Sequence, residues 1–409
     1  MRNHSVLTLV EFQSREAALP REVYDVLRTR YAGKIDLTPT ERHGTYKVAA
    51  RDFVGRISLP GGMMLVIQPK VGVSNLFYML CAAPALARFH PPPAQIAENP
   101  DILPFIFSAL VNGIESLARR GLYKAYVSQE EDLSFVRGRI NLTAQLTRYG
   151  RLKHRHVCRY ADLTSDVPEN RVVASTLRYL PTLLQDQSES GLVHRTRYLS
   201  RLFGGISLVS RRDALALLST IKLHRLNAQY GPVLSLCGLA LRNLTLDERP
   251  GPHPFASFLV DMPRLFESFL TVKLRESLPR YGLRAVAQQH DYLDEGRRVG
   301  IRPDVLVYSR SGATPLLVLD AKYRSLDDNG SDISRDLYQV SAYMDRYGLH
   351  HGVLVYPQFE DATDTRLKMR GTPKHLHVIT LSLVAPDPSQ LEQRCANLAG
   401  QIARLALGD

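Results

Sequence analysis

The sequence predicts an α/β protein, α+β overall, in which a C-terminal domain with a mixed central sheet flanked by helices follows a β-rich domain and a largely helical region. Three patterns support this prediction. Near the N-terminus, positions 6, 8, 10 and 12 alternate with their neighbours at the period of a strand. From residue 102 to 120 the apolar positions recur at the period of an amphipathic helix. From residue 251 onward, helical and strand patterns follow in the order helix, strands, helix, strand.

Two proline-rich stretches predict where the domains meet. The chain has 409 residues, and at roughly 100–200 residues per domain this length predicts two or three domains. Residues 91–93 (Pro-Pro-Pro) and 250–254 (Pro-Gly-Pro-His-Pro) interrupt regular structure, because proline continues neither a helix nor a central strand. We therefore expect a β-rich N-terminal domain over 1–95, a mostly helical middle region over 96–250 and an α/β domain over 251–409.

The elements expected in the first two regions follow from periodicity and turn residues. Short strands are predicted over Tyr46–Ile57 and Met63–Ile67, on either side of a Pro-Gly-Gly turn at 60–62. A helix is predicted over Ile102–Arg120, and several more between residues 170 and 245, where breaks such as Gly204-Gly205 separate apolar-periodic segments. Hydrophobic residues make up 44% of the chain, which is enough to form real cores.

The C-terminal region has the clearest pattern. A helix is predicted over Asp261–Ser277, with Asp261 as its N-cap. The apolar run from Leu316 to Leu319 lies in a strand predicted over Pro315–Tyr323, and its lack of alternation indicates burial on both faces. The other expected elements are strands over 283–292, 299–308, 352–356 and 375–383, a helix over 333–347 and a terminal helix.

The charge of the chain favours a polyanionic partner. Lys and Arg number 52 against 40 Asp and Glu, a formal net charge of +12, and neutralising phosphates releases condensed counterions. From Leu133 to Ala161 there are seven Lys or Arg residues and no carboxylate. Such clustering is typical of phosphate contact, although charge runs are more often solvated faces. The residues expected to contact DNA in this run are Arg148, Arg151, Lys153 and Arg155.

Several classes of protein are excluded by what the sequence lacks. The four cysteines form no Cys-x-x-Cys pair, which indicates reduced thiols and neither a zinc site nor a disulfide framework. No apolar run approaches the roughly 20 residues of a membrane span, and the N-terminus has no signal-peptide pattern. No phosphate-binding Gly-x-x-x-x-Gly-Lys-Ser/Thr loop is present, so this chain is expected to bind no nucleotide itself. We expect a cytoplasmic protein with no membrane contact.

Two aspartates and a lysine form the pattern that carries chemistry. Asp304 follows Ile301-Arg302-Pro303, and after a further fifteen residues comes Asp320-Ala321-Lys322 at the end of an apolar strand. Residues two apart on a strand share a side, so Asp320 and Lys322 are expected to lie together. Two carboxylates and the backbone oxygen of Ala321 suit Mg²⁺, with Mn²⁺ as an alternative. The pattern alone is weak, because a structural salt bridge at a strand end has the same residues.

The same residues resemble a known family. Residues 302–304 and 320–322 resemble the PD-(D/E)xK nuclease core, and residues 337–343 resemble the Gln-x-x-x-Tyr helix of its RecB-like branch. A wider match is to McrC, the nuclease subunit of McrBC modification-dependent restriction systems. It covers residues 75–380, whereas residues 1–70 are interpreted as an added β domain. The matching segments are Asn75–Leu80, Arg119–Leu122, Arg137–Ile140, Asn170–Val173, Leu265–Glu267 and Gly352–Pro357.

The resemblance implies a concrete function. McrC-like proteins cleave double-stranded, methylcytosine-containing DNA when assembled with McrB, a ring-forming AAA+ GTPase, whose hydrolysis their N-terminal half stimulates. The resemblance implies that Asp304 and Asp320 bind the metal and that Lys322 is the catalytic lysine. Glu267, on the preceding helix, is either a further metal ligand or a surface residue. Gln339 and Tyr343 are expected to contact DNA or orient the site, with core packing as the alternative for Tyr343.

Other interpretations stay open at this stage. The Arg137-Gly138-Arg139 turn either contacts the ring or a phosphate, or is structural, and the structural interpretation is slightly favoured. A stand-alone RecB-like repair nuclease would need no partner. A non-catalytic activator of a motor ring would retain the fold for DNA binding alone, against which the intact Asp304, Asp320 and Lys322 argue. Dimerisation through the nuclease subunit also stays open.

Overall fold

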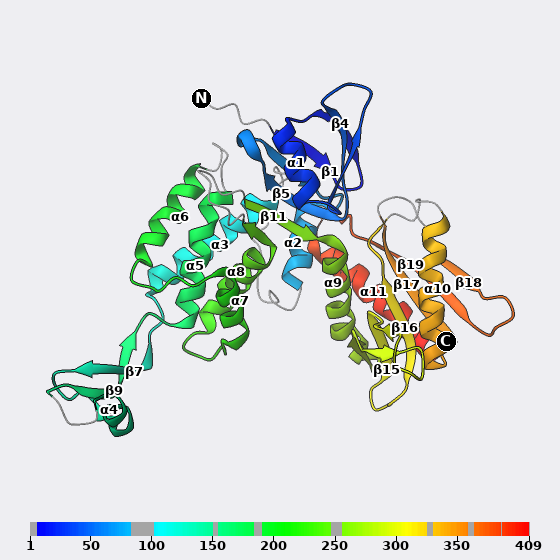
Figure 1. Cartoon of the computed structure of the whole chain (residues 1–409). Coiled ribbons are helices and arrows are strands. Elements are labelled where there is room, and N and C mark those ends of the chain that lie inside the picture. Colours follow the sequence, from blue (N-terminus) through cyan, green and yellow to red (C-terminus); the bar gives the residue numbers. More distant parts are fainter. Residues whose placement is uncertain are drawn as a thin grey trace. The chain divides into compact units, whose positions relative to one another are not determined.

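The structure is a computed structural model that describes residues 6–82, 102–149, 154–183, 190–246, 256–324, 330–358, 364–385 and 387–408. The chain forms two compact units, one of residues 1–105 with 243–409 and one of residues 106–242. Figure 1 shows both units as a mixture of helices and sheets. The α/β class predicted from the sequence is confirmed.

The first unit joins the N-terminal and C-terminal segments through one five-stranded sheet. Its strand order is β1-β6-β5-β11-β10, and β1 runs parallel to β6. The antiparallel pairing of β5 with β11 needs a glycine at position 55, where a Cβ would lie 2.0 Å from the carbonyl oxygen of Phe258. This close pairing places the segments expected as separate domains, 1–95 and 251–409, in a single unit. The bounds are β1 Val6–Val10, β5 Phe53–Ser58, β6 Met64–Gln68, β10 Leu244–Leu246 and β11 Ala256–Asp261.

A smaller layer covers this sheet. The sheet β2-β4-β3 and helix α1 share a core with it, in which Val23 and Leu27 of the helix are buried against Leu7, Ile57 and Leu65. The helix was not expected, because its sequence is rich in arginine and has only a narrow apolar stripe. The bounds are β2 Ser14–Ala18, α1 Arg21–Arg30, β3 Ile35–Pro39 and β4 Thr45–Ala50.

The second sheet of this unit carries the predicted aspartates. Its order is β12-β15-β16-β17-β19-β18, with β15 antiparallel and β17 parallel to β16. Helix α10 packs on one face, where Val340 and Met344 meet Val318 and Leu354. Helices α9 and α11 cover the other face (Figure 1). The bounds are α9 Met262–Ser277, β12 Leu283–Ala287, β15 Val305–Ser309, β16 Pro315–Ala321, α10 Gly330–Tyr347, β17 His351–Gln358, β18 Thr365–Lys368, β19 His375–Ser382 and α11 Pro388–Leu407.

The start of α9 agrees with the prediction, whereas the end of β12 departs from it. Asp261 caps α9 as predicted, since its side chain accepts a hydrogen bond from the Arg264 N–H. The strand expected over 283–292 is broken, because Gln288 has φ +54, a left-handed conformation that ends β12 at Ala287. Residues 291–292 instead form the short strand β13, which pairs with β14 (Gly300–Ile301).

The second unit combines helices with a small sheet. Figure 1 shows the sheet β7-β9-β8 and helix α4 extending from the helices as an arm, a name used below for residues 125–164. The middle region is mostly helical, as expected, but the small sheet of the arm was not expected. The bounds are α3 Ile102–Arg120, β7 Ala125–Leu133, β8 Arg139–Ile140, α4 Leu142–Tyr149, β9 His156–Thr164, α5 Pro168–Leu183, α6 Ser190–Leu202, α7 Arg211–Thr220 and α8 Gly231–Asn243. Among all described residues, no helix is long and apolar enough to cross a membrane.

Candidate functional site

Asp320 lies at the end of the buried strand β16, on the face that α10 covers. Its side chain is almost fully buried, and Lys322 Nζ lies 2.6 Å from its Oδ2. This contact is a close, charge-assisted ion pair. Burial raises the pKa of Asp320 above its usual range, while Lys322 lowers it. A carboxylate in this environment is costly unless a cation compensates it.

Asp304 reaches the same place from the neighbouring strand. It directly precedes β15, which pairs with β16, and its Oδ2 accepts a 2.8 Å hydrogen bond from the Ala321 N–H. Burial, and then the charges of Asp320 and Glu267, raise the pKa of Asp304 to about 8. The two aspartates predicted to converge are therefore neighbours whose charges repel each other.

Lys322 is held between the strand and α10. Its Nζ donates to Gln339 Oε1 over 3.0 Å, and Gln339 Nε2 donates in turn to the Tyr343 hydroxyl over 2.7 Å. Burial alone would lower the pKa of Lys322, but the adjacent Asp320 carboxylate outweighs it, and the pKa is raised. The lysine is therefore a cation, whose orientation Gln339 and Tyr343 help to set.

Gln288 is a residue of the site that the sequence reasoning missed. Its Nε2 donates to Asp304 Oδ1 over 3.1 Å and also hydrogen-bonds Glu267 Oε1, on α9. Burial raises the pKa of Glu267, and the Gln288 amide lowers it. The left-handed break in the chain at Gln288 turns its side chain between the two carboxyl groups. A polar residue in the interior of a predicted strand was the available signal.

A second buried group supports the segment after Lys322. Asp336, on α10, accepts a 2.6 Å hydrogen bond from the Tyr356 hydroxyl and pairs with the Arg324 guanidinium. Asp336 is three residues before Gln339, so both project from neighbouring positions of one helix face. Asp336 was not predicted as part of the site, although it lies three residues before Gln339 in the sequence.

The donor set fits a hard divalent cation. Two buried carboxyl groups, those of Asp304 and Asp320, lie together beside the single ammonium of Lys322. Oxygen ligands are those that Mg²⁺ prefers. Within the described residues, no group of three or more His, Cys, Asp or Glu side chains is placed to hold a metal ion. The candidate ligands are therefore Asp304 and Asp320, whereas the main-chain oxygen of Ala321 and Glu267 stay predictions as ligands.

Two of the four predicted DNA contacts, Arg148 and Arg155, are in the described parts of the arm. Arg155 is more than half exposed and pairs with Asp132, its Nε lying 3.2 Å from Oδ1. Arg148 is in α4, but its side chain is not among those described, and Arg151 and Lys153 lie outside the described residues. Their role in binding DNA stays a prediction.

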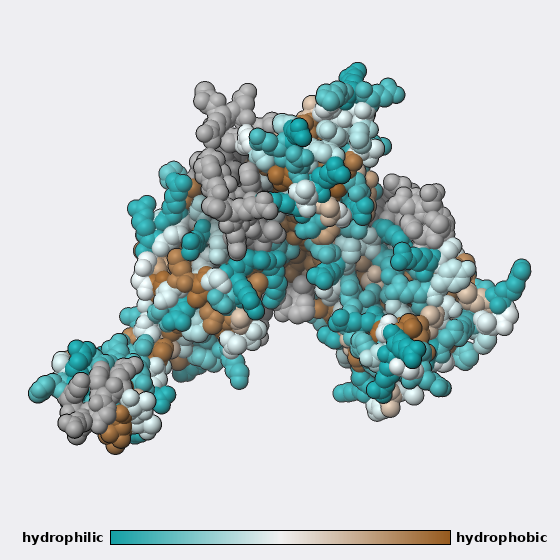
Figure 2. All heavy atoms as spheres, in the orientation of Figure 1, coloured by the Kyte–Doolittle hydropathy of each residue, from teal (hydrophilic) through white to brown (hydrophobic). Residues whose placement is uncertain are grey.

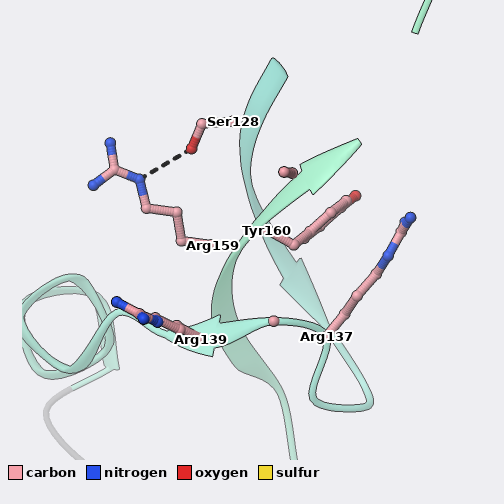
Figure 3. A pocket seen from close by; sticks show the side chains of 7 residues that line it. Ser128, Arg137, Arg139, Arg159 and Tyr160 are labelled. Atoms are coloured by element: carbon pink, nitrogen blue, oxygen red, sulfur yellow. Dashed lines mark hydrogen bonds between the residues drawn. The ribbon is translucent and has the colours of Figure 1, made fainter. Parts of the chain in front are cut away.

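The Arg137-Gly138-Arg139 turn forms part of an arginine-lined hollow on the arm (Figure 3). Gly138 has φ +70, and a Cβ there would lie 2.5 Å from the Arg159 carbonyl oxygen. The Arg137 guanidinium stacks 3.9 Å from the Tyr160 ring centroid and pairs with Asp162. These contacts support a structural role for the turn. Arg139, however, lies directly opposite Arg159 in the β8–β9 pairing.

The arm also exposes large apolar side chains. In Figure 2 a brown patch marks its lower end. Leu142 and Leu146, four apart on α4, are 63% and 60% exposed, so they lie on the same helix face. Other exposed apolar residues of the arm are Tyr126, Phe135, Val136 and Leu163. Contiguous exposed apolar surface marks an interaction site.

The fold and the site together define an α/β protein with a carboxylate–lysine centre at the end of a buried strand. Residues 48–357 match the family model described as "McrBC 5-methylcytosine restriction system component". This match covers well over half of the chain, and the chain belongs to that family. The resemblance to the McrBC restriction systems that was noted in the sequence is confirmed.

Two relatives illustrate the similarity. The chain is 26% identical over 322 residues to the "Type IV methyl-directed restriction enzyme EcoKMcrBC" of Escherichia coli K12, covering 74% of this chain and 91% of that protein. Its fold is similar to a chain in the half-complex of Thermococcus gammatolerans McrB AAA+ hexamers with bound McrC. That match has a TM-score of 0.63 and 18% identity, and covers 97% of this chain and 100% of the other. At that identity the similarity shows the fold alone.

Proposed function

We propose that this chain is the nuclease subunit of a McrBC-type restriction system. It is a Mg²⁺-dependent endonuclease of the PD-(D/E)xK type that cleaves methylcytosine-containing DNA when assembled with an AAA+ GTPase ring. The observation that carries the proposal is the convergence of Asp304, Asp320 and Lys322 at the end of β16. Family membership supports it, because the family is that of a 5-methylcytosine restriction system.

The residues of the site have complementary tasks in phosphodiester hydrolysis. Asp304, Asp320 and the Ala321 carbonyl oxygen would hold the cation. A Mg²⁺ ion held by these groups would supply positive charge against the scissile phosphate and would lower the pKa of a bound water. The Lys322 ammonium adds a fixed positive charge where negative charge develops on the phosphate. Gln339 limits the directions in which that ammonium can point, because its Oε1 accepts a hydrogen bond from one of the three N–H groups of Lys322.

The arm supports the proposal of a protein partner. It exposes large apolar side chains, among them Leu142 and Leu146 on one face of α4. Arg159 lies opposite Arg139 on one neighbouring strand and opposite Glu130 on the other, so an acidic residue of the arm itself already lies beside it. The apolar side chains suit a partner with an apolar surface. The related solved complex contains McrB AAA+ hexamers with bound McrC, and we infer that this chain has an equivalent ring-forming partner.

The test is reconstitution with methylated DNA. The purified chain is mixed with its AAA+ partner, GTP and Mg²⁺, and plasmid DNA with or without methylcytosine is added. We expect cleavage of the methylated plasmid only when all components are present. Metal-dependent cutting by the chain alone would support a stand-alone nuclease. GTPase stimulation without any cleavage would support a non-catalytic activator, and either result would refute the proposal.

A further inference from the structure

Tyr323 directly follows Lys322 and points to the other side of the chain. It is 5% exposed, and its ring lies between Phe12 and Phe266, with centroids 6.0 and 5.8 Å away. Successive residues of an extended chain point to opposite sides, so Lys322 faces α10 while Tyr323 faces α9 and the N-terminal strands. Phe266 is the neighbour of Glu267. Tyr323 is thus packed where α9 meets the N-terminal segment of the chain. The name N-terminal module is used below for residues 6–70.

Glu11 binds the Tyr323 hydroxyl from the N-terminal module. The hydroxyl donates to Glu11 Oε1 over 3.0 Å, and the Lys70 N–H donates to the same oxygen over 2.6 Å. Glu11 is fully buried, and burial raises its pKa to about 7. Glu11 and Tyr323 are 312 residues apart in the sequence. Burying a carboxyl group lowers the stability of the fold. We therefore expect Glu11 to have a role that an apolar side chain could not have.

The turn that presents Glu11 is strained. Phe12 has φ +61, a left-handed conformation that is uncommon for an aromatic residue. Main-chain hydrogen bonds hold it there, from Phe12 N–H to the Ala50 oxygen and from Gln13 N–H to the Val10 oxygen. Such strain persists where the surrounding structure fixes the backbone, and it concentrates at functional sites.

We propose that Glu11 is a positioning residue of the nuclease site. Through the Tyr323 hydroxyl it fixes the chain immediately after Asp320, Ala321 and Lys322, so the N-terminal module forms part of the framework of the site. The inference rests on the proposed nuclease function. If Glu11 only held the two segments together, its replacement would lower the stability of the fold and leave kcat unchanged.

The chain offers a matched control for that alternative. The Asn75 side chain, on α2 (Val73–Ala82), is also fully buried and joins the N-terminal and C-terminal segments of the same unit. Its Nδ2 donates to the carbonyl oxygens of Leu383 (3.0 Å) and Ala385 (2.7 Å). Those residues follow β19, so this link holds the segments together at a different place from Lys322.

The experiment compares Glu11→Leu, Glu11→Gln, Tyr323→Phe and Asn75→Leu in the full chain, assembled with its AAA+ partner. We expect Glu11→Leu and Tyr323→Phe to lower kcat for DNA cleavage by about tenfold or more, with KM for DNA unchanged, because small displacements of catalytic groups are that costly. Glu11→Gln keeps an oxygen for both donors and should restore kcat to near the wild-type value. Asn75→Leu should reduce thermal stability and leave kcat intact. Equal loss of kcat in Asn75→Leu and Tyr323→Phe, or no loss in Tyr323→Phe, would overturn the proposal.

A second measurement separates this inference from the proposed function. Hydrogen exchange of the metal-free chain reports on order without requiring cleavage. Tyr323→Phe keeps the ring and should fold, even if Glu11→Leu does not. We expect it to speed amide exchange in residues 320–324 and to leave residues 383–385 unchanged. Unchanged exchange at 320–324 would refute the positioning role, whether or not the wild-type chain cuts DNA.

Discussion

The Ala321 N–H donates a 2.8 Å hydrogen bond to Asp304 Oδ2. This bond ties a carboxylate that precedes β15 to the backbone of β16, between Asp320 and Lys322. The convergence of the three side chains is therefore set by the pairing of two buried strands, and not by a flexible loop. Such a framework is what a metal-dependent reaction requires, because its groups must be held in place before the substrate arrives.

The hydrogen-bonded chain from Lys322 through Gln339 to Tyr343 predicts a graded effect of mutations. Gln339→Leu removes the acceptor for the lysine and should lower kcat for cleavage by about tenfold to a hundredfold. Tyr343→Phe removes only the bond behind Gln339 and should have a smaller effect. Tyr338→Phe is the control, since Tyr338 is on the same helix but is 73% exposed. Steady-state cleavage rates test this order, and a loss in Tyr338→Phe as large as in Tyr343→Phe would contradict it.

The raised pKa of Glu11 predicts a specific dependence of stability on pH. Its pKa is about 7 in the folded chain, against 4.5 for an ordinary exposed glutamate. Between these pH values the unfolded chain loses the proton first, so this group makes stability fall as pH rises through that window. Gln cannot titrate, and Glu11→Gln should therefore gain thermal stability relative to wild type as the pH rises from about 5 to about 7.5. If the curves of melting temperature against pH were parallel for the wild type and Glu11→Gln, this effect of Glu11 on stability would be ruled out.

The exposed apolar face of α4 predicts a separable binding defect. Leu142→Ser with Leu146→Ser should weaken binding to the AAA+ partner by about tenfold or more, because buried apolar anchors dominate interface energy. The melting temperature should barely change, since both side chains are exposed. Tyr198→Ser, at an exposed position on α6 outside the arm, is the control. Calorimetric titration measures the affinities. Unchanged affinity in the double variant would show that this face is not the contact.

The parts of the fold that could be predicted from the sequence are those in which pattern and packing agree. The helix after Asp261 was predicted with its cap, because the N-cap residue and the apolar stripe are both local. The strand carrying Asp320 was predicted because burial on both faces leaves an unbroken apolar run. The arm was not predicted, because β7 has charged and exposed residues on both faces and so shows no alternation of hydrophobicity.

The residues of the candidate site likewise include some that the sequence indicates and some that it does not. The proximity of Asp304, Asp320 and Lys322 could be predicted because their spacing places them at the ends of paired strands. Gln288 was missed because its role depends on the break in the chain that turns it toward Glu267 and Asp304. The contact of Glu11 with Tyr323 joins residues 312 apart in the sequence, and no local pattern in one sequence indicates such a pairing.

The most direct test of the account is Asp320→Asn, assayed for DNA cleavage and for GTPase stimulation in the same preparation. The change keeps the shape of the side chain but removes the charge that would hold the metal beside Lys322. We expect cleavage of methylated DNA to fall by roughly a hundredfold or more, as for the loss of other charge-stabilising groups, while stimulation of the partner's GTP hydrolysis stays at the wild-type level. Cleavage that persists in this variant would contradict the assignment of the site.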